Sequence, residues 1–383
     1  MSVMKQFKIS AYLASPIHIG TGDTLDPFSY VIKDKKLYRF DTSAYISKLE
    51  SNKINQITQI LKKPSLSSTL EARKFIYDNF EYEKMKDIIF EEQDLNKGSF
   101  GASYEKNLSS LANNDPRNKA MNQLEIEAIY SSGGVPIIPG SSIKGSIRTA
   151  IINKIIEDEG IHYNPKEINA YKNLMKNMNF SFTDDIFKCL KISDFSPTKK
   201  EVRKTVGYFL NFPKNSLDKE IGDTTMSVAA EVIMPFQLFI GEISVSAVPE
   251  HTYKSQFKKI LADKTELFKC LNRHYLELFK KDYKLFESNA PKNMFVTVAK
   301  EQFLEKLSNN DYAVIKVGKH SGAEGVTFKE RAITIKGNKK RQTVYDAKEP
   351  GTVWYFSRYN SKDLKQLSQK EKEIFPLGWM VLI

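Results

Sequence analysis

Residues 138–151, IPGSSIKGSIRTAI, decide how the rest of the chain is interpreted. Pro139 and Gly140 end an extended run, and Ser141 or Ser142 can then cap a helix by accepting a hydrogen bond from its first backbone N–H groups. Behind this cap, isoleucines at 143, 147, 151 and 155 recur every fourth residue. The spacing predicts an amphipathic helix whose apolar stripe faces a core.

Lys144 and Arg148 repeat at the same spacing on a neighbouring face of the predicted helix. Cations, hydroxyls and unpaired N–H groups around a helix start form an anion site, and phosphate is the expected anion. Gly145 lies inside the helix, where glycine costs about 1 kcal/mol relative to alanine, and such a position often admits the close approach of another backbone. An ordinary capped helix with a solvated Lys/Arg face explains the pattern equally well.

The composition indicates a soluble globular protein with a polyanionic partner. The chain has 383 residues, of which 41% are hydrophobic, and its formal net charge is +12. A positive surplus of this size favours nucleic acid, because binding releases the counterions of the polyanion. We find no run of about 18 apolar residues, no signal peptide and no helix with one basic and one aromatic face. We therefore expect a cytoplasmic location and no membrane partner.

The sequence carries no pattern for a metal, a nucleotide cofactor or a nucleophilic enzyme. Cys189 and Cys270 are far apart and the five histidines are scattered, so neither a disulfide nor a zinc site is expected. The glycine-rich run at 318–325 is followed by a strand-like segment, whereas nucleotide fingerprints need a helix there. We expect no cofactor, no metal and no catalytic residue. His18, beside a glycine-rich loop, is the histidine considered as a general acid or base in RNA cleavage.

Predicted strands and helices alternate in blocks along the chain. Strand patterns occur at 3–13, 30–33, 37–40, 189–193 and 312–317, and again near the C-terminus. The stretch 42–130 reads as mainly helical, apart from a polar surface loop at 95–119, and further helices are expected near 166–178 and 253–289. New strands begin around residue 228, which gives expected domains at 1–227 and 228–383.

The segment 197–219 combines six basic residues with Tyr208, Phe209 and Phe212. Such a mixture suits phosphate contacts and base stacking, which contributes roughly 1–3 kcal/mol per stacked base. A strand with core aromatics and solvated lysines is the competing interpretation.

Five short motifs occur in a fixed order: SPIHIGTG at 15–22, IPGSSIKGSIRTAI at 138–151, KISDF at 191–195, VGKHSGAEG at 317–325 and LGWMVL at 377–382. Together they resemble the RAMP superfamily of CRISPR RNA-binding proteins. Within it, the order, the spacing and the chain length are most similar to the family of fifth subunits of the Csm complex, from type III-A systems.

The resemblance implies an α+β fold with two ferredoxin-like (RRM-like) domains, the first with a helical insertion at about 42–130 and the second with a helical segment at about 253–289. It implies a non-catalytic subunit that binds crRNA and caps the 3′-end side of a Csm filament. Such a subunit supports crRNA maturation in antiviral defence by recruiting host nucleases. The implied partners are crRNA, target RNA in the assembled complex, and other Csm subunits, especially the backbone RAMP subunit.

The candidate RNA-binding residues come from the glycine-rich motifs and the predicted helix start: His18, Gly20, Gly22, Gly140, Ser141, Ser142, Lys144, Arg148, Gly318, Lys319, His320, Gly322 and Gly325. Two alternatives stay open. Asp26 occupies a position comparable to that of the target-cleaving aspartate in the backbone RAMP subunit, which would make the chain a metal-dependent endoribonuclease. The chain could also act as a pure protein scaffold.

Overall fold

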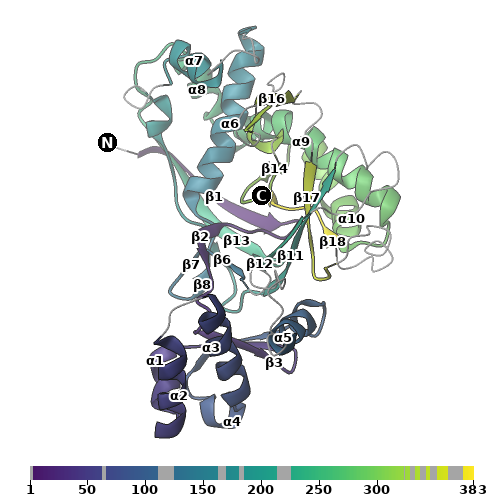
Figure 1. Cartoon of the computed structure of the whole chain (residues 1–383). Coiled ribbons are helices and arrows are strands. Elements are labelled where there is room, and N and C mark those ends of the chain that lie inside the picture. The colour runs from purple at the N-terminus through teal and green to yellow at the C-terminus, as the bar shows by residue number, and fades with distance from the viewer. Residues whose placement is uncertain are drawn as a thin grey trace.

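The chain folds into an α+β structure with a main body and a smaller lobe below it (Figure 1). The computed structural model describes residues 3–62, 66–110, 125–162, 170–180, 185–213, 226–322, 324–327, 333–336, 342–345, 352–360 and 374–383. Within these residues two six-stranded sheets form the main body, and a three-stranded sheet lies in the lobe. The α+β class predicted from the sequence is confirmed.

The first large sheet joins the two ends of the chain. Strand β1 (Val3–Leu13) lies inside it and pairs antiparallel with β13 (Leu238–Ser246) on one side and with β19 (Trp379–Leu382) on the other. The remaining strands pair with β19 or with β13: they are β14 (Ala313–Lys316), β9 (Leu190–Ile192) and β10 (Ser196–Pro197). The strands predicted at 3–13, 189–193 and 312–317 are thus confirmed.

The second large sheet is mixed. Its strand order is β18 (Ile374–Phe375), β17 (Thr352–Ser357), β11 (Lys204–Pro213), β12 (Met226–Ile233), β6 (Glu127–Ile129) and β2 (Gly20–Thr24). Strands β12 and β6 are parallel, and the other neighbours are antiparallel. The expected domain boundary at residue 228 falls within β12, and each large sheet takes strands from both sides of that boundary.

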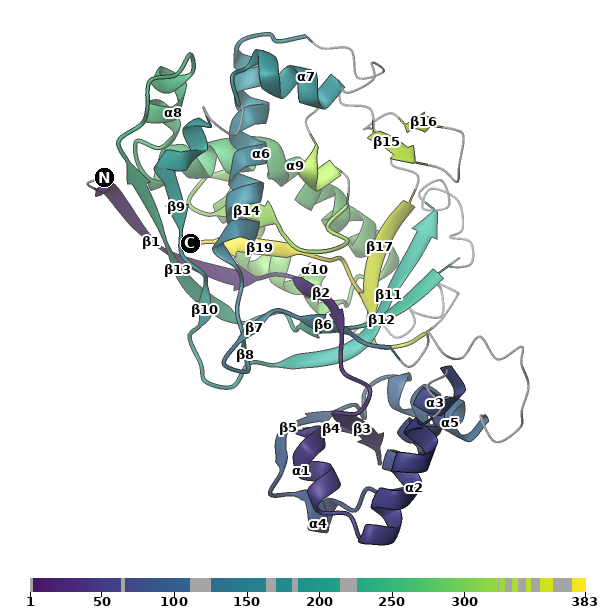
Figure 2. The ribbon, with the colours of Figure 1, turned by 60° about the vertical axis from the view of Figure 1, so that its left-hand side comes forward.

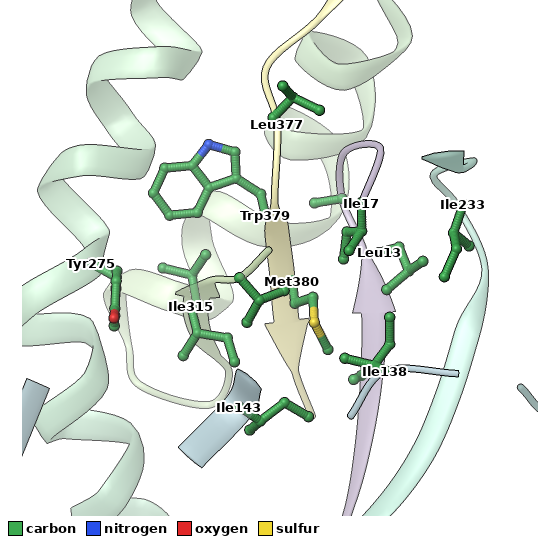
Figure 3. Packing of buried hydrophobic residues seen from close by; sticks show 14 of the residues in the cluster. Leu13, Ile17, Ile138, Ile143, Ile233, Tyr275, Ile315, Leu377, Trp379 and Met380 are labelled. Atoms are coloured by element: carbon green, nitrogen blue, oxygen red, sulfur yellow. The ribbon is translucent and has the colours of Figure 1, made fainter. Parts of the chain in front are cut away.

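Two long helices pack against each other and against β14: α6 (Gly140–Asp158) and α9 (Lys264–Asn289). The predicted isoleucine stripe of α6 is confirmed, because its members at 143, 147, 151 and 155 are all fully buried. Figure 3 shows Ile143 of α6 and Tyr275 of α9 converging with Ile315 of β14 and with Trp379 and Met380 of β19. The phenol of Tyr275 lies 3.1 Å from the main-chain oxygen of Ser146 in α6 and 3.1 Å from that of Gly325, and its one proton is shared between these two acceptors.

Shorter elements surround this core. They are the helices α7 (Ala170–Asn177), α8 (Lys254–Ile260), α10 (Met294–Val298) and α11 (Leu304–Ser308), and two hairpins, β7 (Ser131–Ser132) with β8 (Val135–Pro136) and β15 (Ile333–Lys336) with β16 (Gln342–Tyr345). None of the helices in the described ranges is long and apolar enough to span a membrane.

The lobe has its own sheet and core, and Figure 2 shows it below the main body. Its strands β3 (Tyr30–Lys33), β4 (Lys36–Phe40) and β5 (Ile89–Asp94) are accompanied by α1 (Thr42–Ser47), α2 (Ser51–Leu61), α3 (Leu66–Asn79), α4 (Tyr82–Met85) and α5 (Phe100–Ser110). The ring of Phe40 stacks on Tyr45 and Phe80 with centroids 5.0 and 5.9 Å apart. The strands expected at 30–33 and 37–40 are confirmed.

The stretch predicted as mainly helical contains helices α1 to α5, and strand β5 completes the sheet beside β4. The expected surface loop is wrong in part. Part of the predicted surface loop at 95–119 is helix α5, because Phe100, Tyr104 and Leu108 recur every fourth residue and are all buried. The remainder, 111–119, lies outside the described residues.

A partly buried charge cluster fastens the lobe to the second sheet. Lys204 of β11 places its Nζ 2.7 Å from an oxygen of Glu91 in β5 and 3.3 Å from one of Glu231 in β12. Arg39 of β4 also pairs with Glu91, at 3.1 Å. The Glu231 side chain is 1% exposed, and these cations offset the cost of burying its negative charge.

Candidate nucleic-acid interface

Three predicted segments that lie far apart in the sequence meet at one groove. The groove has a volume of about 650 Å³ and is lined by the start of β2, by β6, by one face of α6 and by the segment that follows β14. We call it the central groove. Six of the predicted RNA-binding residues line it: His18, Gly20, Gly22, Ser142, Gly318 and Lys319.

Main-chain hydrogen bonds hold these segments together. The carbonyl of His18 accepts from the N–H of Lys319 at 2.8 Å, and the carbonyl of Pro16 accepts from the N–H of Gly378 at 2.9 Å. Gly318 has φ +85°, and a Cβ added there would lie 2.4 Å from the oxygen of His18. Only glycine meets both requirements, so the glycine of VGKHSG lets this loop touch the loop of HIGTG.

The wall formed by α6 is made of small and hydroxyl side chains. Ser142, Gly145, Ser146 and Thr149 follow the spacing of one helical face, and all four line the groove. Ser146 Oγ donates to the carbonyl of Lys316 at 2.7 Å and fixes the helix to the opposite strand. A Cβ added at Gly145 would meet no atom within 4 Å. The expected approach of another backbone to this glycine is therefore not found among the described residues, and the space beside it is open.

The start of α6 differs from the prediction. The N-cap is Pro139, and no side chain caps the helix from that position, so the predicted serine cap is wrong. Asp194 of the KISDF motif instead accepts from the N–H of Gly140 at 2.8 Å, and this carboxylate meets the positive end of the helix. Gly140 is buried, and a Cβ added there would lie 2.2 Å from the main-chain oxygen of Ile192. This glycine therefore permits close packing of the helix start on β9.

Lys144 and Arg148 lie outside the central groove, on another face of α6. Lys144 Nζ donates to the carbonyl of Leu190 at 2.7 Å, and burial lowers the pKa of its ammonium group. Arg148 pairs with Asp185 at 2.6 Å, and its guanidinium lies 4.4 Å from the ring centroid of Phe187. Both cations thus hold the segment 185–190 against α6. Whether either also contacts RNA stays a prediction.

The two histidines of the glycine-rich motifs are packed into the protein. His18 is 1% exposed, its Nδ1 lies 2.7 Å from the carbonyl oxygen of Glu231, and burial lowers its pKa. His320 has φ +60° and stacks on Trp354 with centroids 4.1 Å apart. Burial lowers the pKa of His320 to about 4. Both rings are therefore neutral near pH 7.

The lysines of the groove are already paired within the chain. Lys316 Nζ lies 3.0 Å from an oxygen of Asp282, and Lys319 Nζ pairs with Glu127. Asp23, which is exposed, adds a second carboxylate to the lining. Among the described residues, the groove thus offers backbone, hydroxyls and carboxylates rather than unpaired cations.

The remaining predicted site residues lie apart from the groove lining. Ser141 is exposed at the first turn of α6, Gly322 has φ +86° in an open position, and Gly325 is buried beneath the phenol of Tyr275. The aromatic side chains proposed for base stacking are buried instead in β11, with Tyr208 5% exposed and Phe209 and Phe212 fully buried. The interpretation as a strand with core aromatics is therefore the correct one.

Asp26 lies in the turn between β2 and β3 and does not line the groove. Its Oδ1 accepts from the N–H of Phe28 at 3.0 Å. No group of three or more histidine, cysteine, aspartate or glutamate side chains that could hold a metal ion occurs in the part of the chain that the structure describes. Cys189 and Cys270 are free and buried.

Sequence reasoning missed part of the groove. Ser146 and Thr149 could have been found, because they share the helical face of Ser142 and Gly145. Glu127 and Lys316 gave no signal, because each is a lone charged residue at a strand that only the folded sheet brings to the groove.

The sequence and the fold place this chain among known proteins. Residues 11–375 match the RAMP superfamily. The chain belongs to this superfamily. Over 213 residues it is 26% identical to the CRISPR system Cms protein Csm5 of Streptococcus thermophilus, a match that covers 50% of the chain and 52% of that relative. The aligned part thus spans about half the length of the curated relative.

Solved structures extend the fold comparison over the whole RAMP chain. A chain of the cryo-EM structure of a Csm–crRNA–target RNA ternary complex of a type III-A CRISPR–Cas system superimposes with a TM-score of 0.59. That match covers 98% of this chain and 100% of the other at 16% identity. The crystal structure of T. onnurineus Csm5 gives a TM-score of 0.47, with 81% and 89% of the two chains covered at 16% identity. The RAMP superfamily predicted from the short motifs is confirmed by the match over residues 11–375.

Proposed function

We propose that this RAMP protein is a crRNA-binding subunit of a type III-A CRISPR effector complex and that the RNA lies in the central groove. The observation that carries the proposal is the meeting of HIGTG, of α6 and of VGKHSG around one open hollow. Its lining of backbone and small side chains suits a sugar–phosphate strand of any sequence, as spacer RNA requires. The net charge of +12 adds affinity that is independent of sequence.

We also propose a more detailed role, which the resemblance of the short motifs implies. The proposed subunit is non-catalytic, caps the 3′-end side of the filament and supports crRNA maturation by recruiting nucleases in antiviral defence. Its proposed partners are crRNA, the other Csm subunits, above all the backbone RAMP subunit, and target RNA in the assembled complex. The proposed fold has two ferredoxin-like domains, and the lobe is the proposed insertion, since its elements lie in the chain between β2 and β6 of the second large sheet.

The groove is tested by filling it. In the reconstituted complex, Gly145→Leu should weaken binding of labelled crRNA by about tenfold or more, because its side chain enters the space that the RNA would occupy. Ser51→Leu adds the same side chain at an exposed position of α2 in the lobe, outside the groove lining, and should bind crRNA as the unchanged chain does. Equal affinities for both variants and the unchanged chain would contradict the proposed path of the RNA.

The two alternatives have their own tests. Labelled target RNA is incubated with the complex and a divalent metal, and metal-dependent cuts that Asp26→Ala abolishes would establish the endoribonuclease. A chain that joins the complex but shows no RNA affinity of its own at low salt, and no loss with Gly145→Leu, would be a protein scaffold.

A further inference from the structure

Two hydrogen-bond acceptors face each other in the wall of the central groove. The Nδ1 atom of His18 lies 2.7 Å from the main-chain oxygen of Glu231. A carbonyl oxygen can only accept, so Nδ1 carries the ring proton. In a neutral imidazole Nε2 then has a bare lone pair and is an acceptor. Burial lowers the pKa of His18, which keeps the ring in this form at neutral pH.

The second acceptor belongs to Glu127. One of its carboxylate oxygens, Oε1, pairs with the ammonium group of Lys319. The other, Oε2, is buried, lies 3.6 Å from Nε2 of His18 and has no hydrogen-bond partner among the described residues. Two lone pairs therefore converge with no donor of the described chain between them. Unsatisfied buried acceptors are unfavourable, so a hydrogen-bond donor from a ligand would stabilise this pair.

The groove gives such a donor access. Gly20 lines the groove beside His18, and a Cβ added to Gly20 would lie 2.6 Å from Nε2. The absence of a side chain at this position leaves Nε2 uncovered. Any larger residue would shield the acceptor pair from a ligand in the groove.

We propose that the acceptor pair of His18 Nε2 and Glu127 Oε2 binds a ribose 2′-hydroxyl and thereby makes the central groove select RNA over DNA. The inference rests on the proposed function, since it assumes that a nucleic-acid strand lies in this groove. A carboxylate repels phosphate oxygens but accepts from a hydroxyl. The 2′-hydroxyl is a donor that every nucleotide of RNA carries, whatever its base, and that DNA lacks.

A metal ion between the same two atoms is the competing occupant. Zinc, the metal that a histidine and a carboxylate suit, uses three or four protein ligands. The described residues hold no group of three or more candidate ligands, so a hydroxyl donor fits the geometry better.

Modified oligonucleotides test the inference without any mutation. The complex is offered strands of one sequence as RNA, as DNA and as 2′-O-methyl RNA, which keeps the sugar pucker of RNA but has no proton to donate. RNA should bind about tenfold or more tightly than either of the other two strands. Equal binding of RNA and 2′-O-methyl RNA would overturn the inference, and so would an RNA preference that disappears when EDTA removes divalent ions.

Glu127→Gln tests the residues themselves. Its amide can donate to His18 Nε2, which closes the pair within the protein, so the preference for RNA should fall to within about twofold while the strand still binds. Glu301→Gln is the matched control, because it makes the same change at an exposed position outside the groove lining, and it should retain the preference. An unchanged preference in Glu127→Gln would exclude the acceptor pair and leave the proposed function intact. Failure of the unchanged complex to bind any of the strands would instead reject the proposed function.

Discussion

Two faces of helix α6 have different roles in the structure. One face carries Lys144 and Arg148, whose charged groups contact the segment 185–190 of the same chain. The other carries Ser142, Gly145 and Thr149, which have little charge to offer but line an open groove. The comparison teaches that a cation pattern on a helix marks a ligand site only when no other element of the chain uses those cations.

The largest effect on stability should come from the glycine at the start of this helix. We expect Gly140→Ala to lower the free energy of unfolding by about 3 kcal/mol, because its Cβ would lie 2.2 Å from the main-chain oxygen of Ile192. Urea titration followed by circular dichroism measures the effect. A loss below about 0.5 kcal/mol would mean that the start of α6 is not held against β9 as described.

Acid should lower the free energy of unfolding through His320, which lies in the glycine-rich loop after β14. The pKa of His320 is about 4 in the folded chain, against about 6.5 for an unfolded histidine. Between these two values the unfolded chain binds more protons, so stability falls as the pH drops from 6.5 to 4 and His320 adds no further loss below that. We expect this histidine to contribute about 2 kcal/mol of that loss, allowing for its partial exposure.

His320→Asn is the control for this pH dependence. Asparagine tolerates the positive φ at position 320 but does not titrate. Thermal melts of both proteins between pH 4 and 7 should show a flatter profile for the variant, with a remaining slope from His18, whose pKa is also lowered. Parallel profiles would assign the acid sensitivity to other groups.

The cation face should prove more important for stability than for binding. Arg148→Ala removes a partly buried ion pair and a cation–π contact, and we expect a loss of about 1 kcal/mol in unfolding free energy. We expect the affinity for crRNA to fall less than in Gly145→Leu. The salt dependence of crRNA binding tests whether Arg148 contacts RNA. If the slope of log affinity against log salt concentration became smaller by about one unit in Arg148→Ala, Arg148 would neutralise a phosphate.

The smallest effect should have the opposite sign. Gly145→Ala adds one methyl group to an open part of the groove and replaces a glycine inside a helix. We expect a gain of about 0.5–1 kcal/mol in stability, with crRNA affinity changed less than threefold. A tenfold loss of affinity from this one methyl group would mean that the RNA touches the backbone of α6 directly.

Periodic features of the fold could be predicted from the sequence, and contacts between distant segments could not. The isoleucine stripe of α6 and strand β1 follow from local spacing, and both are confirmed. The cap of α6 comes from Asp194, 54 positions after the Gly140 that it contacts, where no local pattern points to it. Helix α5 was missed because a polar, glycine- and serine-rich composition concealed the spacing of Phe100, Tyr104 and Leu108.

The same limit applies to the candidate site. Its glycine motifs were recognisable, since glycine at a loop implies an unusual backbone or a close approach. The acceptor pair was not, because Glu127 reaches His18 only through the pairing of β6 with β2 and β12. Tyr208 and Phe209 were ambiguous between stacking and core roles until the sheet that buries them was known.

The position of β19 has a consequence for how the protein is made. This strand lies between β1 and β14, yet it is formed by the residues at 379–382. During translation β14 cannot join the first sheet until the residues of β19 have left the ribosome. The hydrogen bond from the N–H of Gly378 to the carbonyl of Pro16 also forms only then. A chain that lacks β19 would therefore expose the edges of β1 and β14, and exposed strand edges are prone to aggregation.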